Sequence, residues 1–214
     1  MNRNPVYIVG GGGSLINFDF SKLKDKDTIA INVAALDVPD PTYCITADSS
    51  VFKKVQTGYF KDVQTTWVLV TNPNHRTMKM ENGIFKNVRT GFVYNLLCMD
   101  MVIRNADVEG IGFSFSNFKT GYNSGFCGLQ LAVLLGYTEI HLLGFDMTAG
   151  KKCHYHDEYH NRKISKNSFN LYVNNFILAL NILKSKTCIK VISHSNISSL
   201  NEFISYESLE SIVL

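Results

Sequence analysis

The chain has 214 residues, of which 45% are hydrophobic and 18% are charged, and its formal net charge is +3. This composition is typical of a soluble globular protein, and the length suits one domain with a substantial core rather than two. The mild charge excludes the concentrated basic face that a duplex nucleic-acid binder needs. No run approaches the roughly 18 apolar residues of a membrane span.

A strand is predicted almost at the first residue, so we expect no secretory signal. The cysteines are five in number and widely spaced, with no CxxC pair. These features predict a cytoplasmic protein with reduced thiols that serve mainly in packing.

Apolar runs predict six strands, in chain order at residues 6–9, 28–32, 43–46, 67–71, 139–143 and 189–193. Helical spacing of apolar residues predicts helices at 124–135, ending at Gly136, and at 168–186, with Ser168 as N-cap. A final helix begins within 198–204. The polar segment 72–87 contains an Asn-Gly pair and is predicted to be a loop or hairpin.

Nearly continuous apolar strands that alternate with helices predict an α/β fold, with a mostly parallel sheet covered by helices on both faces. The sequence has no linker, internal repeat or low-complexity segment. We therefore expect one domain over 1–214. Residues 148–167 form a long polar segment without a helix or strand pattern, which is typical of a functional or disordered loop.

The first predicted strand runs into a glycine-rich loop. The sequence there is VYIVGGGGSL, and the loop residues are Gly10, Gly11, Gly12, Gly13 and Ser14. Glycines let the backbone approach an anionic group, and a helix beginning at Ser14 would offer free N–H donors and a positive dipole end. The loop has neither GxGxxG spacing nor the Lys-Ser/Thr pair of a P-loop. A nucleotide-phosphate loop is favoured over a purely structural turn.

Other polar residues follow predicted strands, where open α/β sheets bind their ligands. Asn32 offers an amide to a nucleotide, or else forms a turn. Asp48 either binds a metal or sugar hydroxyl, or caps a short helix. Ser124 and Gly125 begin the predicted helix after Asn123, and they form either a second anion site or a cap with close helix packing.

Past the fifth strand the chain reads HYHDEYH, residues 154–160, among several lysines and arginines. Histidine supplies a general base with a suitable pKa, and tyrosine can hydrogen-bond a phosphate leaving group. The HxH and HxxxH spacings are also compatible with a metal, although no HExxH motif or cysteine pair is present. Base or substrate-binding chemistry is favoured over a metal site and over a merely exposed polar loop.

Several motifs taken together resemble the bacterial lipooligosaccharide sialyltransferases of glycosyltransferase family 42. They are VYIVGGGGSL, an Asn closing the second strand, NSGFCGLQLAVLLGYTEIHLLGFDM, the HY-containing loop, and ALNILKSKTCIKVISHSNISSL. The resemblance covers most of the chain outside about 55–117. Parts of the pattern also occur in the related MptE-like family (domain of unknown function 115), which includes hydroxymethylpterin diphosphokinases, and in many short phage-encoded proteins. A phage-encoded member is therefore one expectation.

The resemblance implies a Rossmann-like, GT-A-type domain and a glycosyltransferase that uses a cytidine-monophosphate sugar without a required metal or other cofactor. A lid histidine, His156 or His160, would deprotonate the acceptor hydroxyl. Residues 148–167 would form the lid. The donor would contact residues matched by the family pattern, namely Gly10–Ser14, Asn32, Ser124 and Asp146.

The chain departs from the family pattern at three loop positions. Gly11 and Gly13 replace an Asn and a Pro, and Thr148 stands where the family has a tyrosine, so Tyr155 or Tyr159 would have to substitute. The expected partners are a nucleotide-sugar donor and a glycan or small-molecule acceptor, with homo-oligomerisation left open. Two alternatives remain: an MptE-like, Mg²⁺-dependent diphosphokinase using Asp48, Asp146 and Asp157, and a non-catalytic nucleotide- or sugar-binding phage accessory protein.

Overall fold

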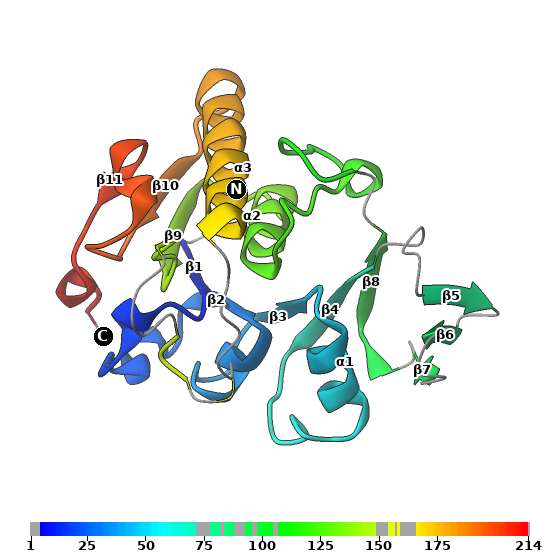
Figure 1. Cartoon of the computed structure of the whole chain (residues 1–214). Helices are drawn as coiled ribbons and strands as arrows, with labels where there is room; N and C mark the ends of the chain where they lie inside the picture. Colours follow the sequence, from blue (N-terminus) through cyan, green and yellow to red (C-terminus); the bar gives the residue numbers. More distant parts are fainter. Residues whose placement is uncertain are drawn as a thin grey trace.

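The structure is a computed structural model, and it describes residues 5–71, 78–81, 84–87, 93–95, 98–104, 107–148, 154–156, 158 and 166–213. Its centre is an eight-stranded sheet with the order β11-β10-β9-β1-β2-β3-β4-β8 (Figure 1). All of its paired strands run parallel. The bounds are β1 Val6–Val9, β2 Asp27–Ile31, β3 Tyr43–Thr46, β4 Thr66–Thr71, β8 Met101–Arg104, β9 Glu139–Leu143, β10 Lys190–Ser193 and β11 Ser205–Tyr206.

Beside β8 lies a small antiparallel sheet of β5 Met78–Glu81, β6 Ile84–Asn87 and β7 Val93–Asn95 (Figure 1). The α-helices are α1 Ser49–Gln56, α2 Ser124–Leu134 and α3 Lys166–Lys186, and 3₁₀ turns include Gly13–Leu15, Asn32–Leu36 and Ser199–Glu202. No helix in the described part of the chain is long and apolar enough to cross a membrane.

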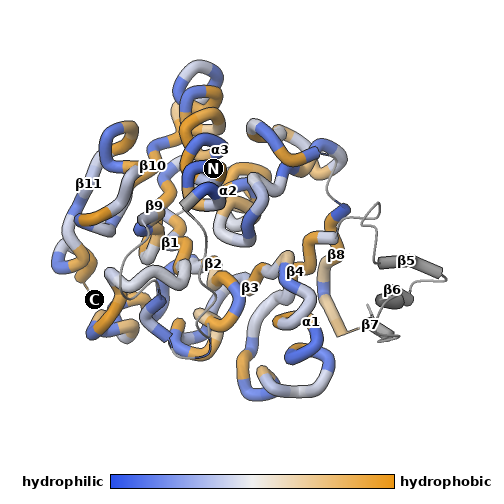
Figure 2. Tube along the Cα trace, viewed as in Figure 1, coloured by the Kyte–Doolittle hydropathy of each residue, from blue (hydrophilic) through white to orange (hydrophobic). Residues whose placement is uncertain are grey.

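Alternating side chains of the strands build two cores, one on each face of the sheet. Ile8 of β1 belongs to the core under α2 and α3, whereas its neighbour Val9 belongs to the core that holds α1 and the 3₁₀ turns. Figure 2 shows hydrophobic residues concentrated along the central strands and α2. Because both faces are covered, the strands are apolar throughout, as expected of a parallel sheet.

The predicted α/β, Rossmann-like class is confirmed, and the six predicted strands are present with bounds shifted by at most one residue. The short edge strands β8 and β11 were not predicted, because they carry too few buried residues to produce a pattern. The predicted final helix is wrong, since the chain there forms only the 3₁₀ turn Ser199–Glu202. Helix α3 already includes Lys166, so Ser168 is not its cap.

Helix α2 ends as its sequence predicts. The N–H of Tyr137 donates to the carbonyl of Ala132, and the N–H of Gly136 donates to that of Val133. This is a Schellman motif, in which Gly136 takes a left-handed φ of +82°. The turn directs the chain back into β9, the neighbour of β1.

Strand β1 lies between β2 and β9. Strands β2, β3, β4 and β8 follow on one side of β1, and the later strands β9, β10 and β11 follow on its other side. The carboxyl ends of β1 and β9 therefore form the topological switch point of the sheet. In open α/β sheets the ligand crevice lies outside this point.

Candidate functional site

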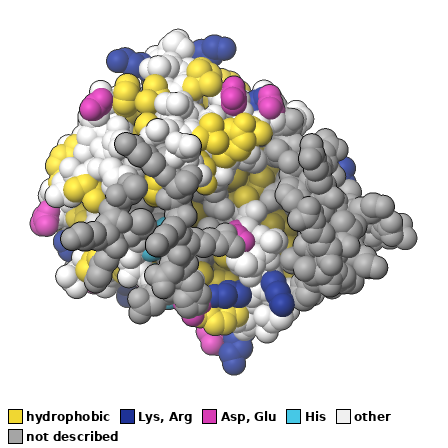
Figure 3. Space-filling view, in the orientation of Figure 1, with side chains coloured by type: hydrophobic (Ala, Val, Ile, Leu, Met, Phe, Trp, Pro, Cys, Tyr) yellow, Lys and Arg dark blue, Asp and Glu magenta, His cyan; other side chains and the backbone are white. Residues whose placement is uncertain are grey.

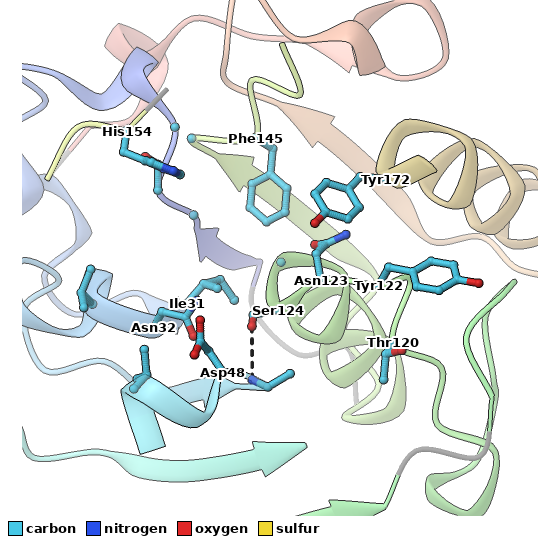
Figure 4. A pocket seen from close by; sticks show the side chains of 18 of the residues that line it. Ile31, Asn32, Asp48, Thr120, Tyr122, Asn123, Ser124, Phe145, His154 and Tyr172 are labelled. Atoms are coloured by element: carbon cyan, nitrogen blue, oxygen red, sulfur yellow. Dashed lines mark hydrogen bonds between the residues drawn. The ribbon is translucent and has the colours of Figure 1, made fainter. Parts of the chain in front are cut away.

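A cavity of about 1060 Å³ opens at the carboxyl ends of the central strands. Its wall consists of the glycine loop, the segments that follow β2, β3 and β9, the first residues of α2, and part of α3 (Figure 4). Figure 3 shows this face of the molecule hollowed near its centre, with hydrophobic side chains in the wall. The volume lies at the upper end of the range for small-molecule sites.

The glycine loop continues the pairing of β1 with β9. The N–H of Gly10 donates to the Leu143 carbonyl at 2.8 Å, and the N–H of Gly12 donates to the Gly144 carbonyl at 2.9 Å. A Cβ on Gly12 would lie 2.5 Å from the Gly144 oxygen and 2.7 Å from Cγ of Asp146. Glycine is thus required at position 12, because the glycine loop and the loop after β9 approach each other closely there. Gly10, Gly11 and Gly12 also line the cavity.

The expectation of a helix beginning at Ser14 with free donors is wrong. The chain makes a three-residue 3₁₀ turn with Gly12 at its cap position. The backbone N–H of Ser14 donates to Oδ2 of Asp146 at 2.9 Å, and its hydroxyl donates to Oδ1. The carboxylate of Asp146 therefore occupies the anion position at this turn. Ser14 and Gly13 are not among the residues of the cavity wall, whereas Asp146 is.

Asn32 lies directly after β2 and faces the cavity (Figure 4). Its φ is +56°, a left-handed conformation that asparagine tolerates better than most residues. Its Oδ1 is buried and accepts no hydrogen bond from the described part of the protein. A strained backbone and an unsatisfied buried acceptor each carry a free-energy cost, and such costs concentrate at functional sites.

Asp48 and Ser124 both line the cavity, and both have structural contacts. Oδ1 of Asp48 accepts from the N–H of Ser50 at 2.9 Å, so the helix-cap interpretation is confirmed. The cap of α2 is Asn123, and Ser124 is its first helical residue. The hydroxyl of Ser124 accepts from the N–H of Ala47 at 3.2 Å, and this bond joins α2 to the end of β3 (Figure 4).

The lid contributes His154 to the cavity. This residue forms an isolated β-bridge with Gly12, and its Nδ1 lies 3.2 Å from the carbonyl oxygen of Gly11. A carbonyl can only accept, so Nδ1 carries the proton in this contact. His154 is therefore held against the glycine loop at the point where it lines the cavity.

The neighbouring lid residues are directed elsewhere. The Tyr155 hydroxyl donates to Oδ2 of Asp37 at 2.9 Å, and its ring packs against Phe20. Nδ1 of His156 accepts from the N–H of Glu158 at 3.0 Å, and its Nε2 lies 3.9 Å from Oδ2 of Asp37. Neither side chain is part of the cavity wall. Tyr159, His160 and Asp157 lie outside the described residues.

Sequence reasoning missed Tyr172 of α3, which lines the cavity and directs its hydroxyl toward Asn123 (Figure 4). The only available signal was a tyrosine within an amphipathic helix, which ordinarily indicates packing. Gly125 was predicted and is present in the wall, where a Cβ would lie 3.0 Å from the Phe145 ring. The site therefore brings together Gly10–Gly12, Asn32, Asp48, Ser124, Gly125 and Asp146 from the predicted set.

No family model matches the sequence, and no curated protein matches it. Solved structures do resemble the fold. The sialyltransferase CstII from Campylobacter jejuni, in complex with the substrate analogue CMP-3FNeuAc, is 20% identical with a TM-score of 0.56, and the match covers 95% of this chain and 86% of that one. Another CstII structure is in complex with a trisaccharide acceptor and CMP, with a TM-score of 0.55.

The monofunctional alpha-2,3-sialyltransferase Cst-I from Campylobacter jejuni is 14% identical over 96% of this chain and 81% of that one, with a TM-score of 0.57. The MAf glycosyltransferase from Magnetospirillum magneticum AMB-1 is 13% identical with a TM-score of 0.58, and the match covers 99% of this chain but 34% of the longer one. At these identities the likeness shows that the chain has the fold of these glycosyltransferases.

Proposed function

We propose that this chain is a nucleotide-sugar-dependent glycosyltransferase of the sialyltransferase-like type, with a CMP-sugar as donor. The observation that carries the proposal is the buried Oδ1 of Asn32, which accepts no hydrogen bond from the residues that the structure describes and lies at the edge of a large cavity beside the switch point of the sheet. A ribose hydroxyl or the amino group of cytosine would supply the missing donor. The fold shared with CMP-binding enzymes supports the same assignment.

In this proposal the donor phosphate lies between the glycine loop and Tyr172, whose hydroxyl would hydrogen-bond the departing CMP. Nε2 of His154 takes the proton of the acceptor hydroxyl as its oxygen attacks the anomeric carbon, and the glycosidic bond to the phosphate oxygen breaks. His154 replaces His156 as the candidate base, because His154 lines the cavity, whereas His156 does not and its Nδ1 accepts from the N–H of Glu158. A glycan hydroxyl is the proposed acceptor.

A thermal-shift screen with CMP, CDP, UDP, GDP and ATP tests the donor assignment. CMP at 100 times its dissociation constant is expected to stabilise the protein by about 2.7 kcal/mol, which corresponds to roughly 5–10 °C for a chain of this size. In the matched variant, Asn32→Gly, glycine accepts the left-handed backbone and removes the amide. The CMP shift should disappear in this variant. Stabilisation by ATP with Mg²⁺ but not by CMP would contradict the proposal.

Transfer is expected to proceed without Mg²⁺. Both carboxylate oxygens of Asp146 accept from Ser14, and Oδ1 of Asp48 accepts from Ser50, so these side chains are engaged in the protein's own hydrogen bonds. Initial rates of CMP release from a CMP-sugar, measured after EDTA treatment, should not rise when Mg²⁺ is added back. A Mg²⁺-dependent recovery of CMP release would contradict this expectation.

A further inference from the structure

Strands β9, β10 and β11 form one end of the main sheet (Figure 1). Three polar side chains gather there. His141 lies within β9, His194 directly follows β10, and Glu207 directly follows β11. Their ligand atoms all lie within 4.8 Å of one another. The two imidazoles are only 6% and 2% exposed, and none of the three residues lines the large cavity.

The two imidazoles face each other through ring nitrogens, and each has a hydrogen-bond acceptor behind it. Nδ1 of His141 lies 2.8 Å from Nε2 of His194. Nε2 of His141 lies 3.0 Å from Oε1 of Glu139, and Nδ1 of His194 lies 3.2 Å from the carbonyl oxygen of Ser208. The ring of Tyr7 stacks on His141, with centroids 4.5 Å apart, and fixes its plane.

Counting protons shows that two neutral rings cannot make all of these contacts. The carboxylate of Glu139 and the carbonyl of Ser208 are acceptors, so each outer nitrogen must carry a proton. The inner contact between the rings needs a third proton, but two neutral imidazoles carry only two. The neutral pair therefore presents two inward-facing lone pairs.

A divalent ion between the rings resolves this conflict. The inner nitrogens become ligands, and the outer N–H groups donate to Glu139 and Ser208. Metal-bound histidines almost always donate their second N–H to a carboxylate or a backbone carbonyl in this way. The carboxylates of Glu139 and Glu207 both lie in the immediate surroundings of the two imidazoles.

We propose that His141 Nδ1, His194 Nε2 and the Glu207 carboxylate bind a transition-metal ion of the Zn²⁺ type. Zn–N bonds of about 2.0–2.1 Å in tetrahedral geometry require the inner nitrogens to separate to roughly 3.3 Å, a small displacement from 2.8 Å. A second cavity of about 500 Å³ is lined in part by His194. The ion would fasten the segment after β11 to β9 and β10.

Zn²⁺ binding by the full chain, prepared without a histidine tag, tests this site. We expect one tightly bound Zn²⁺ per chain, and a visible spectrum of tetrahedral Co²⁺ on substitution. Glu207→Gln keeps the shape of a half-buried side chain and removes the anionic ligand, so Zn²⁺ affinity should fall at least ten-fold. Lys190→Gln is the matched control, because it removes the ion pair of Lys190 with Glu207 and leaves the ligands intact.

His194→Gln removes an imidazole ligand while its amide can still donate to His141, and it should abolish the Co²⁺ spectrum. His156→Asn should retain it, since His156 is not one of the proposed ligands. The proposal would be overturned if the wild type, Glu207→Gln and His194→Gln bound Zn²⁺ with equal affinity. It would also be overturned if the wild type bound no Zn²⁺, in which case His141 and His194 share a proton between their inner nitrogens. CMP binding is unaffected by either result, so the two proposals fail independently.

Discussion

Replacing His154 by asparagine is expected to lower turnover about 10²- to 10⁴-fold while CMP still binds, because a positioned general base contributes a factor of that size. Asparagine can keep the donor to the Gly11 carbonyl that Nδ1 supplies, so the lid contact survives. The imidazole Nε2 is lost. The measurement is kcat for transfer from a CMP-sugar, together with the dissociation constant of CMP.

His156→Asn is the matched control for this variant. Its amide oxygen can still accept from the N–H of Glu158, and we expect nearly full turnover because the side chain is directed toward Asp37. Full activity of His154→Asn together with a loss in His156→Asn would reverse the assignment. A loss confined to His160→Asn would place the base at that residue.

Gly12→Ala is expected to destabilise the protein by about 3 kcal/mol or more. The new Cβ would lie 2.5 Å from the Gly144 oxygen and 2.7 Å from Cγ of Asp146, so the two loops must separate. Overpacking typically costs about 1–3 kcal/mol, and weakening the bonds of Ser14 to a carboxylate adds about 1.5–3 kcal/mol. The midpoint of urea unfolding measures the change.

Gly58→Ala separates crowding from backbone strain. Gly12 has φ −66° and ψ 150°, which any residue adopts, so only space requires glycine there. Gly58 has φ +76° and nothing within 4 Å of its Cβ position, so only its backbone favours glycine. The expected cost at Gly58 is about 1 kcal/mol. Equal effects of the two substitutions would show that the contact between the glycine loop and Gly144 does not matter for stability.

Much of the fold was predictable because its signals are local. A strand buried on both faces must be apolar, so the central strands are visible as runs in the sequence. Gly136 marks the end of α2 through its left-handed backbone, and Asp48 marks the start of α1 through its side-chain cap. The edge strands β8 and β11 bury too little to leave such a signal. The sequence also predicted that Asn32 stands at the end of the second strand. Asn32 does follow β2, and it lies in the cavity wall.

The candidate site was predictable only in part. The sequence presented the lid as one polar cluster, in which spacing cannot distinguish His154 from His156. That distinction comes from contacts with distant residues: Tyr155 and Asp37 are 118 positions apart, and His154 and Gly11 are 143 apart. Tyr172 reaches the cavity from α3. The amphipathic pattern of this helix predicts which side chains pack against the core, but not which residues lie next to its polar side chains.

By itself, the sequence determined the parallel sheet, its order of elements along the chain, and the glycine loop and Asn32 at strand ends, because burial and backbone conformation are set by neighbouring residues. Only the tertiary structure decided that Asp146 fills the anion position at Ser14, that His154 and not His156 faces the cavity, and that His141 meets His194 across two strands. These outcomes depend on which side chains the strand order brings together, and that order is not encoded in any local pattern.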